Sequence, residues 1–204
     1  MKYLLILIVL IVGSTTAEAQ KSYKKEIKQH RKAYKKEHKE NARSPIDKKN
    51  LRDLRFNDAN EAWRLDCRFT RTESAEAFDM ATYSGQVRPY VLYGRAECPS
   101  PEGVLTLEIY QSIGLRRIPA YRDYLFLPFH DATNGAETYG GGRYLDLKIG
   151  DISGEAVTLD LNKVYNPYCA YADGFSCPIP PRPNHLTIAV PVGEKWSEHF
   201  RDGH

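Results

Sequence analysis

The feature that most constrains the fold of this chain is an alternation of apolar and polar residues that begins at Trp63. Trp63, Leu65, Cys67 and Phe69 alternate with charged or polar residues, the period-two pattern of a strand with one buried face. Seven further runs, bounded by Gly, Pro or Ser as strands usually are, follow at 77–83, 90–96, 104–110, 124–129, 143–149, 156–161 and 185–190. We therefore predict a mainly β fold, an antiparallel β-sandwich or partly closed barrel.

The first 19 residues have the composition of a secretory signal. Lys2 precedes an apolar run from Tyr3 to Val12, and the small-residue site Ala17–Ala19 precedes Gln20. The run is shorter than the roughly 20 residues that span a bilayer. We expect cleavage near Ala19 and export of the mature protein to the periplasm or the exterior of a bacterium. An uncleaved anchor is the alternative.

A basic segment follows the expected cleavage site. Between Lys21 and Arg55 the chain has 14 Lys and Arg against five Asp and Glu, a net charge of +9, whereas residues 56–204 carry −6. Tyr23, Ile27 and Tyr34 fall on one face of a helix. The helix is expected either to pack as a solvated arm on the acidic body or to bind an anionic membrane surface through 21–41. No nucleic-acid partner is expected, because the arm has no base-reading motif.

These patterns divide the chain into five parts. They are a signal peptide (1–19), a basic amphipathic helix (20–43), a linker (44–62), a β domain (63–195) and a C-terminal tail (196–204). The linker begins at Ser44-Pro45, because the residue before a proline is pushed out of the helical region.

Four cysteines in an exported chain predict disulfides. Cys169 and Cys177 flank a stretch that we expect to be a hairpin with Gly174 in the left-handed conformation, which places the two thiols opposite each other. Cys67 and Cys98 would form the second bridge, although four cysteines allow three connectivities. A nucleophilic cysteine is the alternative. The cysteine and histidine spacings fit no zinc motif, and we predict neither a metal nor a cofactor.

Polar residues surround the glycine run 140–142. Asp131, Thr133, Glu137, Tyr139 and Arg143 stand on either side of it and could converge on one concave face. Three glycines without Cβ atoms indicate close packing of another backbone, a ligand-facing loop or a flexible loop. An arginine beside two carboxylates forms either a structural ion pair or part of a catalytic site.

Two long stretches carry a resemblance to a known family. FHDATNGAETYGGGRYLDL, and LNKVYNPYCAYADGFSCPIPPRPNHL with the later GEK, resemble the bacterial family called domain of unknown function 1684 (DUF1684). The short, exported form found in Bacteroidetes-type bacteria is most similar. The resemblance covers about 124–195 closely and 56–110 loosely. His130 departs from the family's usual phenylalanine. The resemblance implies a secreted domain with one polar cluster, and it implies no chemistry.

The family's pattern falls on residues of both stretches. They are Asp131, Thr133, Gly135, Thr138, Tyr139, Gly142, Arg143, Asn166, Pro167, Cys169, Tyr171, Cys177, Pro178, Pro181, Asn184, Gly193, Glu194 and Lys195. A second departure is Leu161-Asn162-Lys163-Val164, where the family usually has Phe-Asn-x-Ala.

Three functional hypotheses follow. The first is an envelope protein that is structural or binds a small polar ligand, such as a glycan or peptide, through tyrosine faces and polar groups. Its candidate site is Asp131, Thr133, Glu137, Tyr139, Arg143, Asn166, Tyr171 and Asn184. The second is a hydrolase with Asp131 or Glu137 as general base and Arg143 stabilising negative charge. The third is a membrane-surface or assembly factor that acts through the basic helix.

Overall fold

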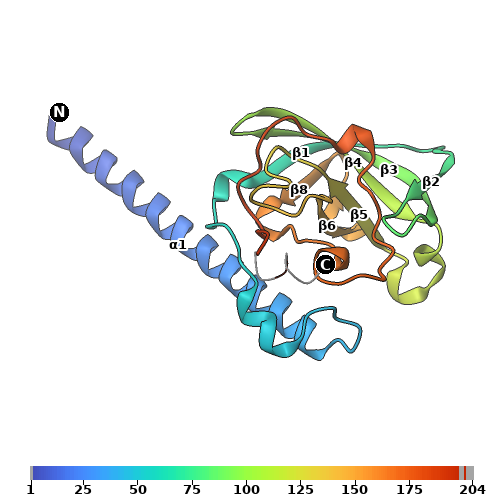
Figure 1. Ribbon diagram of the computed structural model, residues 1–204. Coiled ribbons are helices and arrows are strands. Elements are labelled where there is room, and N and C mark those ends of the chain that lie inside the picture. Colours follow the sequence, from blue (N-terminus) through green and yellow to red (C-terminus); the bar gives the residue numbers. More distant parts are fainter. Residues whose placement is uncertain (1, 198–199, 201–204) are drawn as a thin grey trace.

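A long N-terminal helix precedes an eight-stranded antiparallel sheet in the computed structural model, which describes residues 2–197 and 200 (Figure 1). The helix is α1 (Lys2–Glu40). The strands are β1 (Arg64–Arg71), β2 (Ala77–Ala81), β3 (Val87–Ser100), β4 (Gly103–Ser112), β5 (Tyr124–Phe129), β6 (Arg143–Lys148), β7 (Ile152–Ser153) and β8 (Ala156–Asp160). Short 3-10 helices connect them: η1 (Lys48–Asp53), η2 (Glu61–Trp63), η3 (Leu115–Arg117), η4 (Pro119–Tyr121), η5 (Ile149–Asp151), η6 (Leu161–Lys163), η7 (Tyr168–Ala170) and η8 (Arg182–Asn184).

The sheet is curved but not closed. Its strand order is β6-β5-β4-β3-β1-β8-β7, with β2 added to β3, so β6 and β7 form unjoined edges. The long strand β3 bends at a bulge between Leu92 and Gly94. A Cβ atom at Gly94 would lie 2.4 Å from the ring of Phe69, so only glycine allows β1 and β3 to approach here. The predicted antiparallel, mainly β fold is confirmed.

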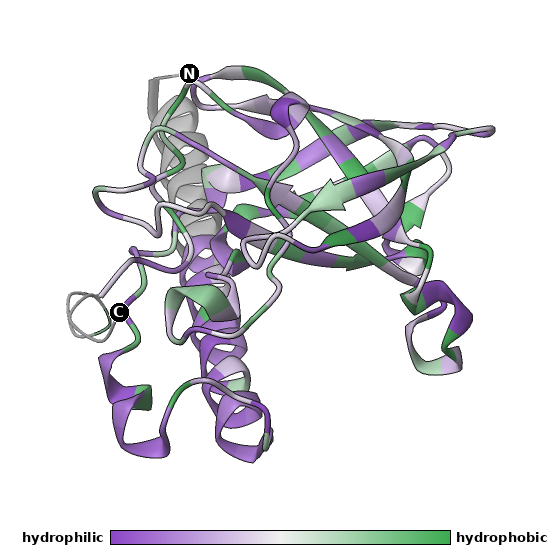
Figure 2. Ribbon diagram, turned by 45° about the vertical axis from the view of Figure 1, so that its right-hand side comes forward, coloured by the Kyte–Doolittle hydropathy of each residue, from purple (hydrophilic) through white to green (hydrophobic). Residues whose placement is uncertain are grey.

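The alternation seen in the sequence appears along the strands as alternating hydrophobic and hydrophilic colouring (Figure 2), and it sorts side chains between the two faces of the sheet. Leu65, Cys67 and Phe69 of β1 enter the main core with the alternate residues of the neighbouring strands. A second, smaller cluster on the other face is aromatic and includes Tyr110 and Tyr144. Both faces of the sheet are therefore covered in part, as burial of each apolar set requires.

Seven of the eight predicted strands are present, and one is wrong. Residues 185–190 form no strand: His185 makes an isolated bridge to His130, and Leu186 and Ile188 make single backbone hydrogen bonds to residues 130 and 132. Leu186, Ile188 and Val190 still pack on the main core, which explains the alternating pattern without a ladder. The two-residue strand β7 was not predicted, because two residues carry no readable period.

Helix α1 is continuous through Ala19 and ends at Glu40, three residues before the predicted end. Tyr23 and Ile27 are buried against the body, and Tyr23 Oη donates to Asp160 at 2.8 Å. The predicted packing of this face on the body is therefore present. Cleavage near Ala19 stays a prediction. None of the helices that the structure describes is long and apolar enough to cross a membrane.

The predicted linker packs on the body, and so do Trp196 and Phe200, which belong to the described part of the predicted tail. Ile46, Leu51 and Leu54 are buried in a cluster with Tyr171 and Phe200. The apolar residues of 44–62 are few, but they are spaced so that η1 can bury them. The segment therefore packs against α1 and the chain around η7 rather than forming a loose linker.

Both predicted disulfides are present, and no cysteine is free. Cys67 and Cys98 lie opposite each other on β1 and β3, with Cα atoms 4.2 Å apart. Cys169 and Cys177 are joined across a loop, with Cα atoms 6.2 Å apart. The hairpin predicted around this loop is wrong, because the chain forms η7 and irregular backbone there, although Gly174 has the expected positive φ of 84°.

Candidate functional site

The side chains of Arg143 and Asp131 form an ion pair inside the protein. Arg143 Nη2 donates to Asp131 Oδ2 at 2.7 Å, and neither side chain has exposed surface. Arg143 also donates to the carbonyl oxygens of Val190 and Val192. Asp131 Oδ1 accepts from both N and Oγ1 of Thr133. Apart from Arg143 Nε, the polar groups are used within the protein, which is the geometry of a structural ion pair.

Asn166 and Tyr171 meet at a second buried carboxylate, that of Glu194. Glu194 Oε1 accepts from Tyr171 Oη, and Oε2 accepts from Asn166 N at 2.9 Å and Tyr34 Oη at 3.1 Å. Burial raises the pKa of Glu194 to about 7, while these hydrogen bonds and the charge of Arg143 oppose the rise. Arg143 also donates to the Glu194 carbonyl oxygen, so the two predicted residues Arg143 and Asn166 both contact this glutamate.

Asn184 has a structural position in the sheet. Its Nδ2 donates to the carbonyl oxygens of Glu108 and Pro128, both at 2.8 Å, and its Oδ1 accepts from Glu108 N at 2.7 Å. β4 and β5 share only one residue pair, Tyr110 with Phe126. The Asn184 amide therefore replaces ladder hydrogen bonds where these two strands separate.

The remaining two predicted residues lie nearer the surface. Glu137 is exposed, and Tyr139 is half-buried against Trp196 with its hydroxyl on the Cys169 carbonyl oxygen. In the glycine run, a Cβ at Gly142 would lie 2.7 Å from the Phe129 carbonyl oxygen. Close packing, the first of the three interpretations of this run, therefore applies at Gly142.

The structure thus buries six of the eight predicted residues. They are Asp131, Thr133, Arg143, Asn166, Tyr171 and Asn184. Asp131 and Glu137 do not share an open cleft, because one is buried and the other is exposed. The geometry gives no support to a hydrolase in which Asp131 or Glu137 acts as general base beside Arg143.

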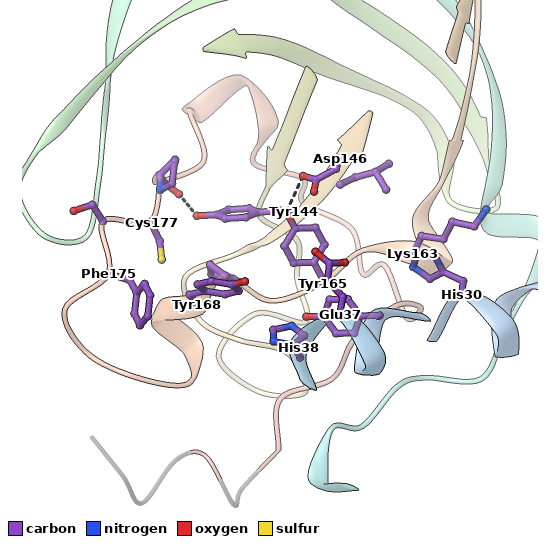
Figure 3. A pocket seen from close by; sticks show the side chains of 15 residues that line it. His30, Glu37, His38, Tyr144, Asp146, Lys163, Tyr165, Tyr168, Phe175 and Cys177 are labelled. Atoms are coloured by element: carbon purple, nitrogen blue, oxygen red, sulfur yellow. Dashed lines mark hydrogen bonds between the residues drawn. The ribbon is translucent and has the colours of Figure 1, made fainter. Parts of the chain in front are cut away.

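An open pocket of about 480 Å³ lies elsewhere, between α1 and the body (Figure 3). We call it the tyrosine pocket, after its aromatic side chains: Tyr34, Tyr144, Tyr165, Tyr168 and Phe175. The hydroxyl of each tyrosine is bonded to another part of the protein. Tyr34 donates to Glu194, Tyr144 to the Pro178 carbonyl oxygen and Tyr165 to Asp146. The Tyr168 hydroxyl accepts a hydrogen bond from Asn41. These anchors fix the rings before any ligand arrives, which favours binding.

β6 provides one wall of the pocket. Tyr144 and Asp146 are two residues apart and project from the same face of the strand. Tyr165 is held beside Tyr144 by two backbone hydrogen bonds of 2.9 and 3.0 Å. Its hydroxyl then reaches Asp146 Oδ1 at 2.7 Å. The strand edge and the chain after η6 therefore form a rigid surface.

The disulfide loop and α1 provide the other walls. The Cys169–Cys177 bridge closes a loop in which the ring of Phe175 lies edge-on to Tyr168, with centroids 5.3 Å apart. From α1, Glu37 and His38 face the body in Figure 3. The pocket exists only because these parts of the chain, more than 100 residues apart, dock together.

The charged groups of the pocket differ in their pairing. Asp146 is exposed and lines the pocket; desolvation by the walls raises its pKa, and the hydrogen bonds from Tyr165 and Tyr124 oppose this. We attribute the rise to the walls around the carboxylate rather than to full burial. Lys163 is bonded to Glu26 at 2.8 Å and to Asp160 at 3.3 Å. Burial lowers the pKa of His38 to about 4, so its imidazole is neutral at physiological pH.

Sequence reasoning did not identify the tyrosine pocket or Glu194 as a site. Asp146 reads as an ordinary outward residue of a strand, and Glu194 as part of a closing turn. The signals in the sequence were the density of tyrosines around Asn166-Pro167, at Tyr165 and Tyr168, and the place of Glu194 in the family's pattern. Among the residues that the structure describes, no three His, Cys, Asp or Glu side chains form a group able to hold a metal ion.

Comparison with known proteins gives similarity without a function. No curated protein matches the chain. A solution NMR structure of an uncharacterised protein from Haloarcula marismortui is similar, with a TM-score of 0.66 and 30% sequence identity. The match covers 87% of this chain and 96% of the other. A share this large must include residues before Lys49.

The family comparison agrees with the resemblance noted in the sequence. Residues 49–195 match the family described as protein of unknown function (DUF1684), and this range covers the whole sheet, both disulfides and the body side of the tyrosine pocket. The chain therefore belongs to the DUF1684 family.

Proposed function

We propose that this protein binds a small polar ligand in the tyrosine pocket. The observation that carries the proposal is an open, concave pocket of about 480 Å³ whose four tyrosine rings are fixed by hydrogen bonds of their own hydroxyls. This volume lies in the range of small-molecule sites, which combine aromatic walls with a few polar groups. The site differs in place from the cluster expected around Arg143, because the Arg143–Asp131 ion pair of that cluster is closed to solvent.

The proposal is tested by NMR titration of the full chain with a panel of sugars, amino sugars, amines and amino acids. A ligand of the pocket shifts the amide signals of residues 34–38, 144–146 and 165–168. Tyr165→Ala removes one ring and is expected to weaken binding at least tenfold. Tyr121→Ala is the matched control, because Tyr121 is an exposed tyrosine outside the pocket. Titration without shifts for the whole panel, or unchanged binding by Tyr165→Ala, contradicts the proposal.

We also propose that the protein acts outside the cytoplasm after cleavage near Ala19. The apolar run 3–12, the Ala17–Ala19 site and the pairing of all four cysteines support this location. Mass spectrometry of the protein purified from an envelope or culture fraction of a bacterial host should give a mature chain that begins at Gln20. An intact chain in the cytoplasmic fraction would contradict it.

A second candidate function, contact with an anionic membrane surface, is favoured by the arrangement of lysines on α1. At 100° per residue, seven exposed lysines fall within about 120° of one face: Lys21, Lys24, Lys25, Lys28, Lys32, Lys36 and Lys39. The buried residues Tyr23 and Ile27 lie on the opposite side, so most of the lysine face is turned away from the body. Lys24, Lys28 and Lys32 also border a groove between the helix and residues 56–59. Figure 2 shows this part of the helix as predominantly hydrophilic.

Lysines near an anionic membrane contribute about 1 kcal/mol each at physiological salt. The mature chain should therefore sediment with vesicles that contain phosphatidylglycerol at low salt, and should be released as salt increases. Replacing Lys25, Lys28 and Lys32 together by Gln is expected to abolish sedimentation. The control replaces Lys48 and Lys49, which lie off the helix. Equal sedimentation with neutral vesicles would contradict this function.

A further inference from the structure

We propose that the ligand of the tyrosine pocket is an organic cation, a small molecule with an amine or quaternary ammonium group. This inference rests on the proposed ligand-binding function and adds the charge and the chemical class of the ligand. It is carried by the combination of electron-rich ring faces with two carboxylates that have no cationic partner among the residues that the structure describes.

The aromatic rings form a continuous arc around the pocket. The centroids of Tyr144 and Tyr165 are 6.0 Å apart, and those of Tyr165 and Tyr34 are also 6.0 Å apart. Tyr34 and Tyr168 are linked through the ring of His38, at 4.7 and 5.7 Å. Because the tyrosine hydroxyls are hydrogen-bonded within the protein, the tyrosines present ring surface rather than hydroxyl groups to a ligand in the pocket. The faces of such rings attract cations, and aromatic cages are a common way to bind quaternary ammonium groups.

Two carboxylates of the pocket are available to a cation. Asp146 accepts both of its hydrogen bonds, from Tyr124 and Tyr165, on Oδ1. Within residues 2–197 and 200, Asp146 Oδ2 has no hydrogen-bond donor and no cationic partner. The Glu37 carboxylate likewise has none in this described part of the chain. Both residues are exposed and line the pocket, so an ammonium group that enters it can reach their carboxylates without displacing a cation of the protein.

The cationic side chains near the pocket do not compensate these carboxylates. Lys163 lines the pocket but binds Glu26 and Asp160. His30 also lines it; burial and the charge of Lys163 lower its pKa, so its imidazole is neutral at physiological pH. The pocket therefore keeps a net negative charge without a ligand, and an ammonium group would neutralise it.

The test compares a cation with its neutral isostere. Choline and 3,3-dimethyl-1-butanol have nearly the same shape, but only choline carries a charge. In an NMR titration of the full chain, choline should shift the amide signals of Glu37, Asp146 and Tyr165, and the neutral alcohol should bind at least tenfold more weakly. Ethanolamine tests a primary amine in the same way.

Two variants assign the effect to named groups. Asp146→Asn keeps the acceptor for both tyrosine hydroxyls but removes the charge, so choline affinity should fall about tenfold while the neutral alcohol binds as before. Glu40→Gln is the control, because Glu40 is on the same helix, lies outside the tyrosine pocket and pairs with Lys36. Tyr165→Phe keeps the ring, and its choline affinity should stay above that of Tyr165→Ala.

The failures of the two proposals are distinguishable. Equal binding of choline and the alcohol overturns the cation but leaves a ligand pocket. Binding of a sugar with no binding of choline or ethanolamine does the same. Unchanged choline affinity in Asp146→Asn overturns the assignment of the charge. If no compound of the wider panel shifts the pocket signals, the ligand-binding function itself is refuted.

Discussion

Replacing Glu194 should change how the stability of the protein depends on pH. Glu194 is fully buried, and its carboxylate accepts hydrogen bonds from three donors that belong to α1 and to the chain after η6. Desolvation nevertheless dominates and raises its pKa to about 7 from an ordinary value of 4.5. In the unfolded chain the same carboxyl group is solvated and has its ordinary pKa.

The direction of this pH dependence follows from the protons that Glu194 binds in the folded and unfolded states. Between pH 4.5 and 7 the folded protein binds more protons at Glu194 than the unfolded chain does, so this contribution to stability falls as the pH rises. Between pH 5 and pH 8 the loss is about 2.5 kcal/mol in the free energy of unfolding. His38 acts in the opposite direction, because its lowered pKa of about 4 makes its contribution fall as the pH drops below 6.5. The wild-type curve alone therefore does not isolate Glu194.

The assay compares wild type with Glu194→Gln, whose neutral amide resembles the protonated acid. Urea unfolding of both proteins at pH 5 and pH 8, followed by fluorescence, gives the difference between their unfolding free energies at each pH. The unfolding free energy of wild type minus that of Glu194→Gln should be about 2.5 kcal/mol larger at pH 5 than at pH 8. Glu102→Gln, an exposed control, should show no such shift. A difference that is the same at both pH values, or a shift of opposite sign, refutes the reasoning.

Three further predictions concern the scaffold. Arg143→Ala leaves a buried carboxylate without its partner, and urea unfolding should show a loss of roughly 3–5 kcal/mol. Gly142→Ala should lower stability by more than about 1 kcal/mol, and by more than the control Gly135→Ala, because both glycines have positive φ but only Gly142 lacks space for a Cβ. Selective loss of the Cys169–Cys177 bridge should lower the free energy of unfolding by about 2.5 kcal/mol. Intact mass should rise by four hydrogens on full reduction, and alkylation of either of these two cysteines without reductant would contradict the bridge.

The strands were predictable because burial on one face leaves a period of two in the sequence. β1 carries this signal over most of its length, and β6 carries it in its second half. β5 was recognisable instead as a short continuous apolar run, because both of its faces are buried. Residues 185–190 show the limit of the same signal. Leu186, Ile188 and Val190 alternate because they cover the core, and alternation reports burial rather than hydrogen bonding.

The site was much less predictable than the fold. Arg143 follows a glycine run and could face solvent or core; only the docking of residues 190–194 against it decides for the core. The tyrosine pocket depends on contacts between α1 and residues 144–178. No local pattern reports which face of a sheet a distant helix will cover. Polar residues near one another in sequence were therefore identified, whereas those brought together by docking were missed.

The position of the tyrosine pocket between α1 and the body has a consequence for the whole molecule. A compound that contacts both walls binds only the arrangement in which they are docked. By mass action it must then stabilise that arrangement, by about 2.7 kcal/mol at 100 times its dissociation constant. A bound ligand would thus slow proteolysis at the lysines of α1, including Lys21 and Lys24, which lie several turns from the rings that hold the ligand.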